Sequence, residues 1–173
     1  VWLASCTRDG EEALLLDALA RATLPAGTLT VIVPRHPQRF GAVADLLAAR
    51  GVPFVRRSDN RDVPPDVSVV LGDSMGEIPA FCAAADVVFV GGSLQAIGGH
   101  NVIEPAAAGV PILVGPHTGH FKDSVTALKA DGGLLQCPDE DSLRKALLDV
   151  LADEPERERM AQANIACVAR NHG

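Results

Sequence analysis

Short apolar runs alternate along the chain with longer segments whose apolar residues recur at helical spacing. The short runs are typical of strands in a parallel sheet, because such strands are covered on both faces. They predict seven strands, over residues 2–6, 29–33, 53–55, 67–71, 87–90, 110–114 and 134–135. The longer segments predict seven helices, over residues 13–22, 38–50, 78–85, 101–108, 121–130, 138–151 and 155–169.

This alternation predicts an α/β fold. Strands joined through helices form right-handed crossovers, which give a Rossmann-like, doubly wound parallel sheet. A polar segment with a Pro-Pro pair, residues 60–66, reads as a surface loop, and we expect the charged last helix to be solvated. Glycine and polar residues gather after strands, the end at which such sheets bind ligands. The pattern therefore predicts a binding crevice at that edge.

The composition limits the possible functions. Of 173 residues, 47% are hydrophobic and only 3% are aromatic, which predicts a core of Val, Leu, Ile and Ala. The net charge of -7 argues against a nucleic-acid groove, because such grooves are basic. No apolar run approaches the roughly 20 residues that span a bilayer, and no signal peptide is visible. The chain opens in a strand without Met, which favours a domain cut from a longer polypeptide.

Side chains that bind metals or form disulfides are poorly placed for either purpose. Four widely spaced cysteines without a CxxC pair are expected to be reduced thiols: Cys6, Cys82, Cys137 and Cys167. Three histidines invite a metal site: His100, His117 and His120. No acidic partner stands at ligand spacing in the loop that holds the last two, so we expect no metal. No nucleophile elbow of the GxSxG type is present.

The stretch over residues 87–94 organises the predicted site. An apolar strand runs into a glycine pair before Ser93, and a second pair that ends at Gly99 leads towards Asn101. Asn101 is a good helix N-cap, and Glu104 stands in capping-box position. Main-chain amides and a helix start would then meet at an anion site. The spacing fits neither a P-loop nor GxGxxG, so simple cradling of a phosphate by amides is the hypothesis.

Three further features have both a structural and a functional interpretation. Residues 35–37, Arg-His-Pro, follow a predicted strand. In the functional interpretation the guanidinium of Arg35 binds a phosphate, and in the structural one it is a solvated side chain before a Pro that begins a helix. Residues 72–77 offer amides and a hydroxyl to a nucleotide, or a turn in which Asp73 or Ser74 caps a helix. Glu104 accepts from ribose hydroxyls or only completes a cap. Glu11 and Glu12 complement the dipole of the first helix.

Taken together, these clusters resemble the carboxyl-terminal half of the bacterial Kdo transferases, GT-B glycosyltransferases that add 3-deoxy-manno-octulosonate to lipid A precursor. The matching motifs run in order over nearly the whole chain, at residues 8–12, 34–37, 72–77, 89–94, 98–101, 104–105 and 115–117. Three positions depart from the usual pattern. Cys6 stands where Ser is usual, Ser74 where Thr is usual, and His120 where Asn is common, which puts a polar role of His120 in doubt.

The resemblance implies that residues 1–173 are a domain that binds the nucleotide sugar CMP-Kdo. The acceptor-binding amino-terminal domain is expected to be absent from this chain. That missing half would hold the lipid A precursor, contact the cytoplasmic face of the bacterial inner membrane, and carry the family's proposed base, a Glu. The isolated domain is therefore expected to be inactive. The implied transfer is inverting, independent of metal and cofactor, and part of lipopolysaccharide core biosynthesis.

The resemblance also implies roles for single residues. Arg35 would stabilise the leaving phosphate as the catalytic contribution of this half, with amides around Ser93, Gly99 and Asn101 as further donors. Glu104 would contact the ribose. The full set of expected substrate-binding residues is Arg35, His36, Pro37, Ser74, Met75, Gly76, Gly92, Ser93, Gly99, Asn101 and Glu104.

Two alternatives stay open. A nucleotide-sugar epimerase domain also uses a two-lobed α/β fold and predicts preference for UDP over CMP. A non-catalytic sugar-nucleotide sensor or scaffold would need no missing half.

Overall fold

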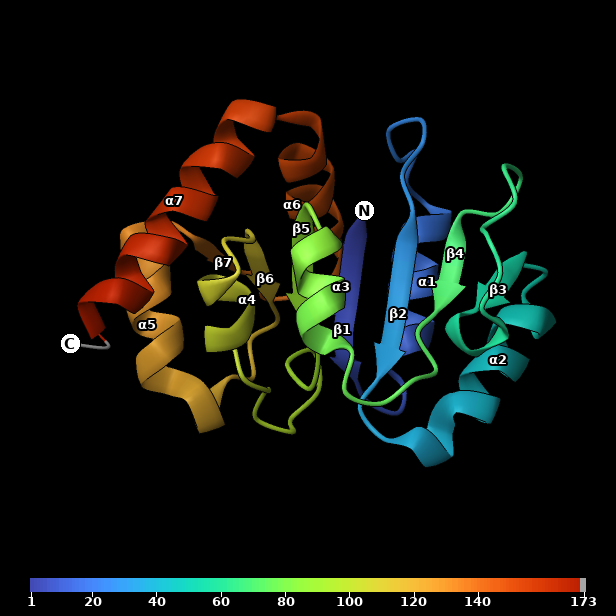
Figure 1. Ribbon diagram of the computed structural model, residues 1–173. Helices are drawn as coiled ribbons and strands as arrows, with labels where there is room; N and C mark the ends of the chain where they lie inside the picture. Colours follow the sequence, from blue (N-terminus) through green and yellow to red (C-terminus); the bar gives the residue numbers. More distant parts are fainter. Residues whose placement is uncertain (172–173) are drawn as a thin grey trace.

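All strands of the central sheet run parallel, in the order β3-β4-β2-β1-β5-β6-β7, in the computed structural model, which describes residues 1–171 (Figure 1). The strands are β1 (Trp2–Thr7), β2 (Thr30–Pro34), β3 (Phe54–Arg56), β4 (Val69–Leu71), β5 (Val87–Val90), β6 (Ile112–Val114) and β7 (Leu134–Gln136). Each lies within two residues of its predicted bounds. The predicted doubly wound α/β fold is confirmed.

Helices follow the strands as the pattern predicts. They are α1 (Glu11–Ala20), α2 (Phe40–Ala49), α3 (Ile78–Ala84), α4 (Ile103–Ala107), α5 (Lys122–Asp131), α6 (Glu140–Ala152) and α7 (Glu154–Asn171). Short 3-10 turns cover Pro37–Arg39, Arg57–Asp59 and Gly119–Phe121. The expected loop over residues 60–66 contains neither helix nor strand.

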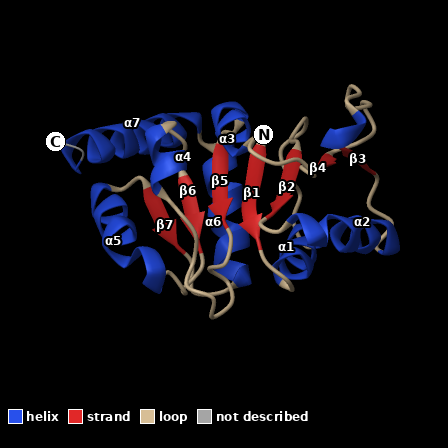
Figure 2. Cartoon of the chain, turned by 60° about the horizontal axis from the view of Figure 1, so that its bottom comes forward, coloured by secondary structure: helices blue, strands red, loops and turns tan. Residues whose placement is uncertain are grey.

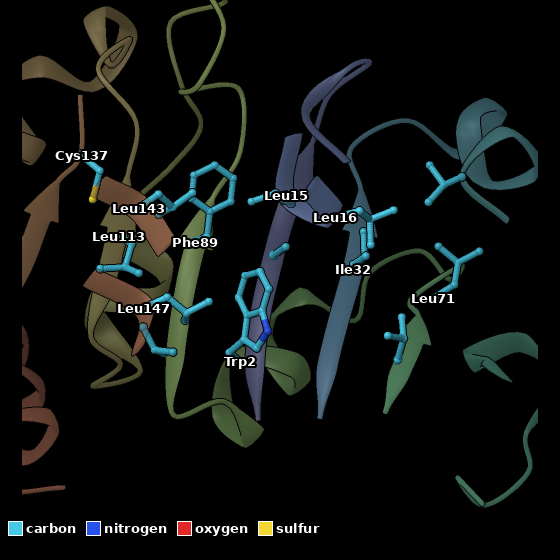
Figure 3. Close-up of a cluster of buried hydrophobic side chains, with 14 of the residues drawn as sticks. Trp2, Leu15, Leu16, Ile32, Leu71, Phe89, Leu113, Cys137, Leu143 and Leu147 are labelled. Atoms are coloured by element: carbon cyan, nitrogen blue, oxygen red, sulfur yellow. The ribbon is translucent and has the colours of Figure 1, made fainter. Parts of the chain in front are cut away.

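Two helical layers enclose the sheet (Figure 2). The apolar faces of α1, α2 and α6 pack on one side against strand residues that include Trp2 and Phe89, both almost fully buried (Figure 3). Helices α3, α4, α5 and α7 cover the other side. Apart from these two aromatic rings the core is mainly aliphatic, as the composition predicts. The Trp2 indole N–H donates to Thr30 Oγ1 at 2.7 Å.

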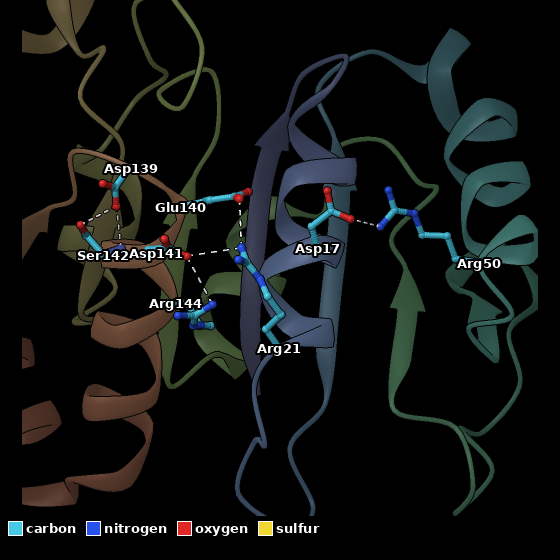
Figure 4. A network of polar contacts seen from close by, with 8 residues as sticks. All are labelled: Asp17, Arg21, Arg50, Asp139, Glu140, Asp141, Ser142 and Arg144. Carbon is cyan, nitrogen blue, oxygen red and sulfur yellow. Dashed lines mark hydrogen bonds and ion pairs between the residues drawn. The ribbon is translucent and has the colours of Figure 1, made fainter.

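Ion pairs join the outer surfaces of α1, α2 and α6 (Figure 4). Arg21, at the end of α1, donates to Glu140 Oε1 of α6 at 3.0 Å. Arg50 pairs with Asp17, which links the end of α2 to α1. Because such exposed pairs contribute only about 0–1 kcal/mol, apolar packing holds this layer on the sheet.

The expectation that the last helix is solvated is wrong for one face of α7. Met160, Asn164 and Cys167 are buried there. The Asn164 amide donates to the carbonyls of Val110 at 2.8 Å and Gly133 at 2.9 Å. These carbonyls stand just before β6 and β7, so α7 is attached to the amino ends of two strands. No helix within residues 1–171 is long and apolar enough to cross a membrane.

The order of the strands changes direction at β1. It pairs with β2 on one side and with β5 on the other. The loops that follow β1 and β5 therefore diverge to opposite sides of the sheet and leave a crevice between their starts. The carboxyl ends of the strands lie at the bottom of the view in Figure 1. The glycine and polar clusters quoted above follow these ends.

Candidate functional site

Two arginines leave neighbouring strands side by side at the carboxyl edge. Thr7 of β1 is in register with Pro34 of β2, and the Arg35 amide donates to the Thr7 carbonyl at 2.9 Å. The next residue on each strand is an arginine, Arg8 or Arg35. Neighbouring strands are about 4.8 Å apart, so the two backbones remain close where the charged side chains begin.

The Glu11 carboxylate lies inside this edge, with 0% of the residue exposed. Its Oε1 accepts from the amides of Gly92 at 2.7 Å and Arg8 at 2.9 Å. Its Oε2 accepts from the amides of Leu94 at 3.1 Å and Ser93 at 3.2 Å. Burial raises the pKa of Glu11, and the four amides oppose that rise because they stabilise the charged form. Glu11 lies in the first turn of α1, as predicted, and its side chain also fills a nest of main-chain donors.

Ser93 is fully buried and joins two strands. Its hydroxyl donates to the Val90 carbonyl at 2.6 Å and accepts from the Gly115 amide at 2.9 Å. The Gly99 amide donates to the Gly92 carbonyl at 2.9 Å. The amides of Gly92, Ser93 and Gly99 therefore all donate within the protein. The expectation that the amides of Ser93 and Gly99 cradle a phosphate stays a prediction, and in this structure both amides donate to protein acceptors.

A cationic cluster surrounds His100 instead. No carboxylate within residues 1–171 lies within 4.0 Å of the Arg8 or Arg35 guanidinium. Burial, together with the smaller effects of the charges of Arg8, Arg35, His36 and His120, lowers the pKa of His100 to about 4. At neutral pH the His100 ring is therefore uncharged. Its buried Nε2 has no hydrogen-bond partner in the part of the chain that the structure describes.

The position of the His100 imidazole explains why residue 92 is a glycine. A Cβ added to Gly92 would lie 2.9 Å from Nε2 and Cδ2 of that ring, and Gly92 has a φ of +71°. Both the close approach and the left-handed backbone favour glycine at this position.

The charges of Arg35 and Glu104 both act on the Cys6 thiol at the end of β1. Burial raises the pKa of the Cys6 thiol, Arg35 lowers it, and Glu104 and Glu11 raise it. Charges from β2 and α4 thus reach the same point at the end of β1. Asn101 Oδ1 accepts from the Ile103 amide at 2.9 Å, but the N-cap of α4 is Val102 and α4 has no side-chain cap, so the predicted N-cap role of Asn101 is wrong.

Residues 72–77 follow β4, and within this segment only Met75 and Gly76 are exposed. Asp73 accepts from the amide of Ser58 at 2.8 Å and from its hydroxyl at 2.6 Å. The interpretation of Asp73 or Ser74 as a helix cap is wrong, because α3 begins at Ile78 and has no side-chain cap. Met75 is 67% exposed, and Gly76 beside it has a φ of +74°. An apolar side chain is therefore displayed at the same edge as Arg35.

The expected site residues lie at several places along the carboxyl edge of the sheet. Arg35 and His36 belong to the electrostatic cluster, and Glu104 and Asn101 stand at the start of α4 beside it. Pro37 is exposed and opens a 3-10 turn. Gly92, Ser93 and Gly99 build the wall of the site.

Sequence reasoning missed three residues of the site: Arg8, Glu11 and His100. Arg8 appeared only as a member of a shared motif, Glu11 also as an acid that complements a helix dipole, and His100 as a possible metal ligand. Within residues 1–171 no group of three His, Cys, Asp or Glu side chains is placed to hold a metal. The four cysteines are free, as predicted.

Comparisons with known proteins agree with this architecture. Residues 52–166 match the family model for glycosyl transferases group 1. The chain is 42% identical to the 3-deoxy-D-manno-octulosonic acid transferase of Bordetella pertussis, over 96% of this chain and 40% of that protein. It is 38% identical to the enzyme of the same name from Haemophilus influenzae, over 100% of this chain and 41% of that protein. The chain thus spans about two fifths of these curated relatives.

One solved structure covers the same region as this chain. It is the crystal structure of the C-terminal CMP-Kdo binding domain of WaaA from Acinetobacter baumannii. The two match with a TM-score of 0.88 and 32% identity, over 96% of this chain and 86% of that one.

Proposed function

Because the chain belongs to the glycosyl transferases group 1, and within them to the carboxyl-terminal domains of 3-deoxy-D-manno-octulosonic acid transferases, we propose that it binds the sugar donor CMP-Kdo. The whole enzyme would then transfer Kdo to lipid A precursor in lipopolysaccharide biosynthesis. The name of the Acinetobacter domain, which this chain matches over nearly its whole length, supports the choice of donor.

The rest of the enzyme is proposed to lie outside this chain. The relatives are about two and a half times as long, which leaves room for an amino-terminal domain that holds the acceptor. That domain would also contact the cytoplasmic face of the inner membrane and supply the base that activates the acceptor hydroxyl. On this proposal the isolated chain binds the donor and does not transfer it.

Arg35 is the residue that we assign to the chemical step. When the bond between the sugar and the phosphate oxygen breaks, negative charge grows on the CMP phosphate, and a group that stabilises this charge lowers the barrier. A guanidinium presents a planar fork of N–H donors that matches the oxygens of a phosphate. The position of Arg35 at the end of β2, without a carboxylate partner within residues 1–171, leaves its guanidinium available to a ligand. We propose that transfer is inverting and needs no metal.

The remaining contacts follow the edge of the sheet outwards from Arg35. The segment Ser74, Met75 and Gly76 is proposed to contact the nucleotide, since the exposed Met75 thioether offers a polarisable surface to a base. Glu104 is proposed to accept from the ribose hydroxyls, with Asn101 beside it. Gly92, Ser93 and Gly99 would act by shaping the loop, because their amides already have partners.

The observation that carries this proposal is the exposed Arg35, which directly follows β2 beside the point where the strand order reverses and has no carboxylate within 4.0 Å in residues 1–171. Calorimetry of the purified domain with CMP, UMP and UDP, each with magnesium or with EDTA, tests it. We expect CMP to bind best and EDTA to leave its affinity unchanged. A preference for UDP would favour the epimerase alternative. CMP binding without Kdo transfer by the full-length protein would favour a sensor.

A further inference from the structure

We infer that Arg8 and Arg35 bind two anionic groups of one ligand, so that the domain selects sugar nucleotides whose sugar bears a carboxylate. Arg35 would hold the phosphate and Arg8 the carboxylate. The inference rests on the proposed function, since it takes the donor to be a cytidine monophosphate sugar. It adds a specificity-determining residue that the motifs alone did not single out.

The backbone places these two charges next to each other. Arg8 and Arg35 each follow the paired residues Thr7 and Pro34, and the Arg35 amide is bonded to the strand that carries Arg8. Like charges on neighbouring strands repel one another, which is unfavourable in the empty site. An anion bound between them relieves this repulsion. The pair is thus suited to a ligand with two negative groups close together.

The acids nearest to Arg8 in sequence are all engaged elsewhere. Glu11 accepts four main-chain amides. Glu12 forms a two-pronged pair with Arg39, at 2.8 and 2.9 Å, and Asp9 also lies towards Arg39, at 3.5 Å. Three carboxylates within four residues thus leave Arg8 unneutralised.

Most other arginines of the protein, unlike Arg8 and Arg35, have a carboxylate partner in the described part of the chain. The protein carries 22 acidic against 15 basic residues. Eight other arginines within residues 1–171 have a carboxylate partner: Arg21, Arg39, Arg50, Arg56, Arg57, Arg144, Arg159 and Arg170. An acidic chain that leaves two adjacent arginines unpaired at the switch point of its sheet concentrates positive potential there.

His100 adds a third contact to this site. Burial and, after it, the charges of Arg8, Arg35, His36 and His120 lower the pKa of its ring. Its buried Nε2 has no partner in the described structure. A neutral imidazole in this position can donate to or accept from the ligand without adding a further charge.

The chemistry of the donor matches this pair of arginines. In an octulosonic acid the anomeric carbon is a 2-keto carbon, so the phosphate ester and the carboxylate are attached to the same atom. Two anions held this close match two guanidinium groups on adjacent strands. A neutral hexose nucleotide would leave Arg8 without a partner, and an unpaired charge that has lost its water lowers affinity.

Surface plasmon resonance with freshly prepared CMP-Kdo, CMP and CDP tests the inference on the purified domain. For wild-type protein we expect CMP-Kdo to bind about tenfold or more tightly than CMP, as a charge-assisted contact predicts. The Arg8→Gln variant should reduce that ratio to about threefold or less, and Arg8→Lys should restore part of it. Arg35→Gln should weaken both ligands. Arg61→Gln, in the exposed loop, is the matched control and should keep the wild-type ratio.

A readout on the wild-type protein removes any dependence on whether the variants fold. NMR titration should show that CMP-Kdo raises the pKa of His100 more than CMP does, because it brings a second anion to the ring. Equal effects of the two ligands, or an Arg8→Gln variant that weakens CMP and CMP-Kdo by the same factor, would overturn the inference. Wild-type CDP binding as tight as that of CMP-Kdo would do so too, since it would assign Arg8 to a second phosphate. If wild-type protein binds neither CMP nor CMP-Kdo, the proposed function fails as well.

Discussion

Two neighbouring places at the carboxyl edge of the sheet are built to receive negative charge, and the protein fills only one of them. The amides of Gly92, Ser93 and Leu94 enclose the Glu11 carboxylate. Beside them, Arg8 and Arg35 have no carboxylate partner within residues 1–171. The difference shows that a glycine-rich loop after a strand indicates an anion site. It does not indicate whether a carboxylate of the protein or an anionic group of a ligand occupies that site.

The amide nest should be the more sensitive of the two places to a loss of charge. In Glu11→Ala, four main-chain amides would lose their acceptor, two of them in buried hydrogen bonds, and each unsatisfied buried group is costly. We expect the free energy of unfolding to fall by about 3 kcal/mol or more, measured by urea denaturation. Asp45→Ala, an exposed acid of α2, should change it by less than about 0.5 kcal/mol.

Adding a small carboxylate to the Glu11→Ala variant tests the same amide nest in a second way. Because Glu11→Ala leaves an open nest of donors, formate should raise the melting temperature of this variant more than that of the wild type. A loss of stability below about 1 kcal/mol, with no response to formate, would show that the amides find other partners.

Removing Arg35 should lower ligand affinity and leave stability unchanged, the opposite of what we expect for Glu11. Arg35→Ala removes an exposed group without an ion pair, so the melting temperature should remain near that of the wild type. CMP affinity should fall by about 1.5–3 kcal/mol in calorimetry, the range for a hydrogen bond to a charged group. Unchanged CMP affinity would remove Arg35 from the site.

Ser93 tests whether the loop is structural. Its hydroxyl bonds both Val90 and Gly115, so Ser93→Ala would leave the buried Gly115 amide without an acceptor. We expect a loss of about 1–2 kcal/mol of unfolding free energy. If chemical denaturation detected no loss, the hydroxyl would not be what joins β5 to β6.

His100 links the two places through pH. Its pKa of about 4 is below its ordinary value of 6.5, so between these values the unfolded chain binds a proton that the folded chain does not. Stability should therefore fall as the pH decreases from 6.5 to 4. Because the ring is only partly buried, we expect the His100→Asn variant to lack about 1 kcal/mol of this decrease, in urea titrations at both pH values. Parallel curves for the two proteins would contradict this role.

Much of the fold could be predicted because it depends on local patterns. Apolar runs and helical spacing locate every strand and helix to within two residues. The buried face of α7 escaped prediction, since its polar member, Asn164, has partners that are 31 and 54 residues away. A buried side-chain amide looks solvated in a sequence unless its partners are known.

The part of the candidate site that could be predicted is the exposed position of Arg35 directly after β2. Which distant side chain accepts from the main-chain amides of the loop could not be predicted. Glu11 reaches amides more than 80 residues away, and Asp73 turns to Ser58 rather than capping α3. Spacing along the chain identified the loop, but only the tertiary structure shows that its amides are occupied.

A crystal structure of the domain with CMP would test the central claim most directly. We predict that the phosphate contacts the Arg35 guanidinium while the Glu11 carboxylate stays on the amides of Gly92, Ser93 and Leu94. A phosphate bound to those amides, with Glu11 displaced, would contradict the account.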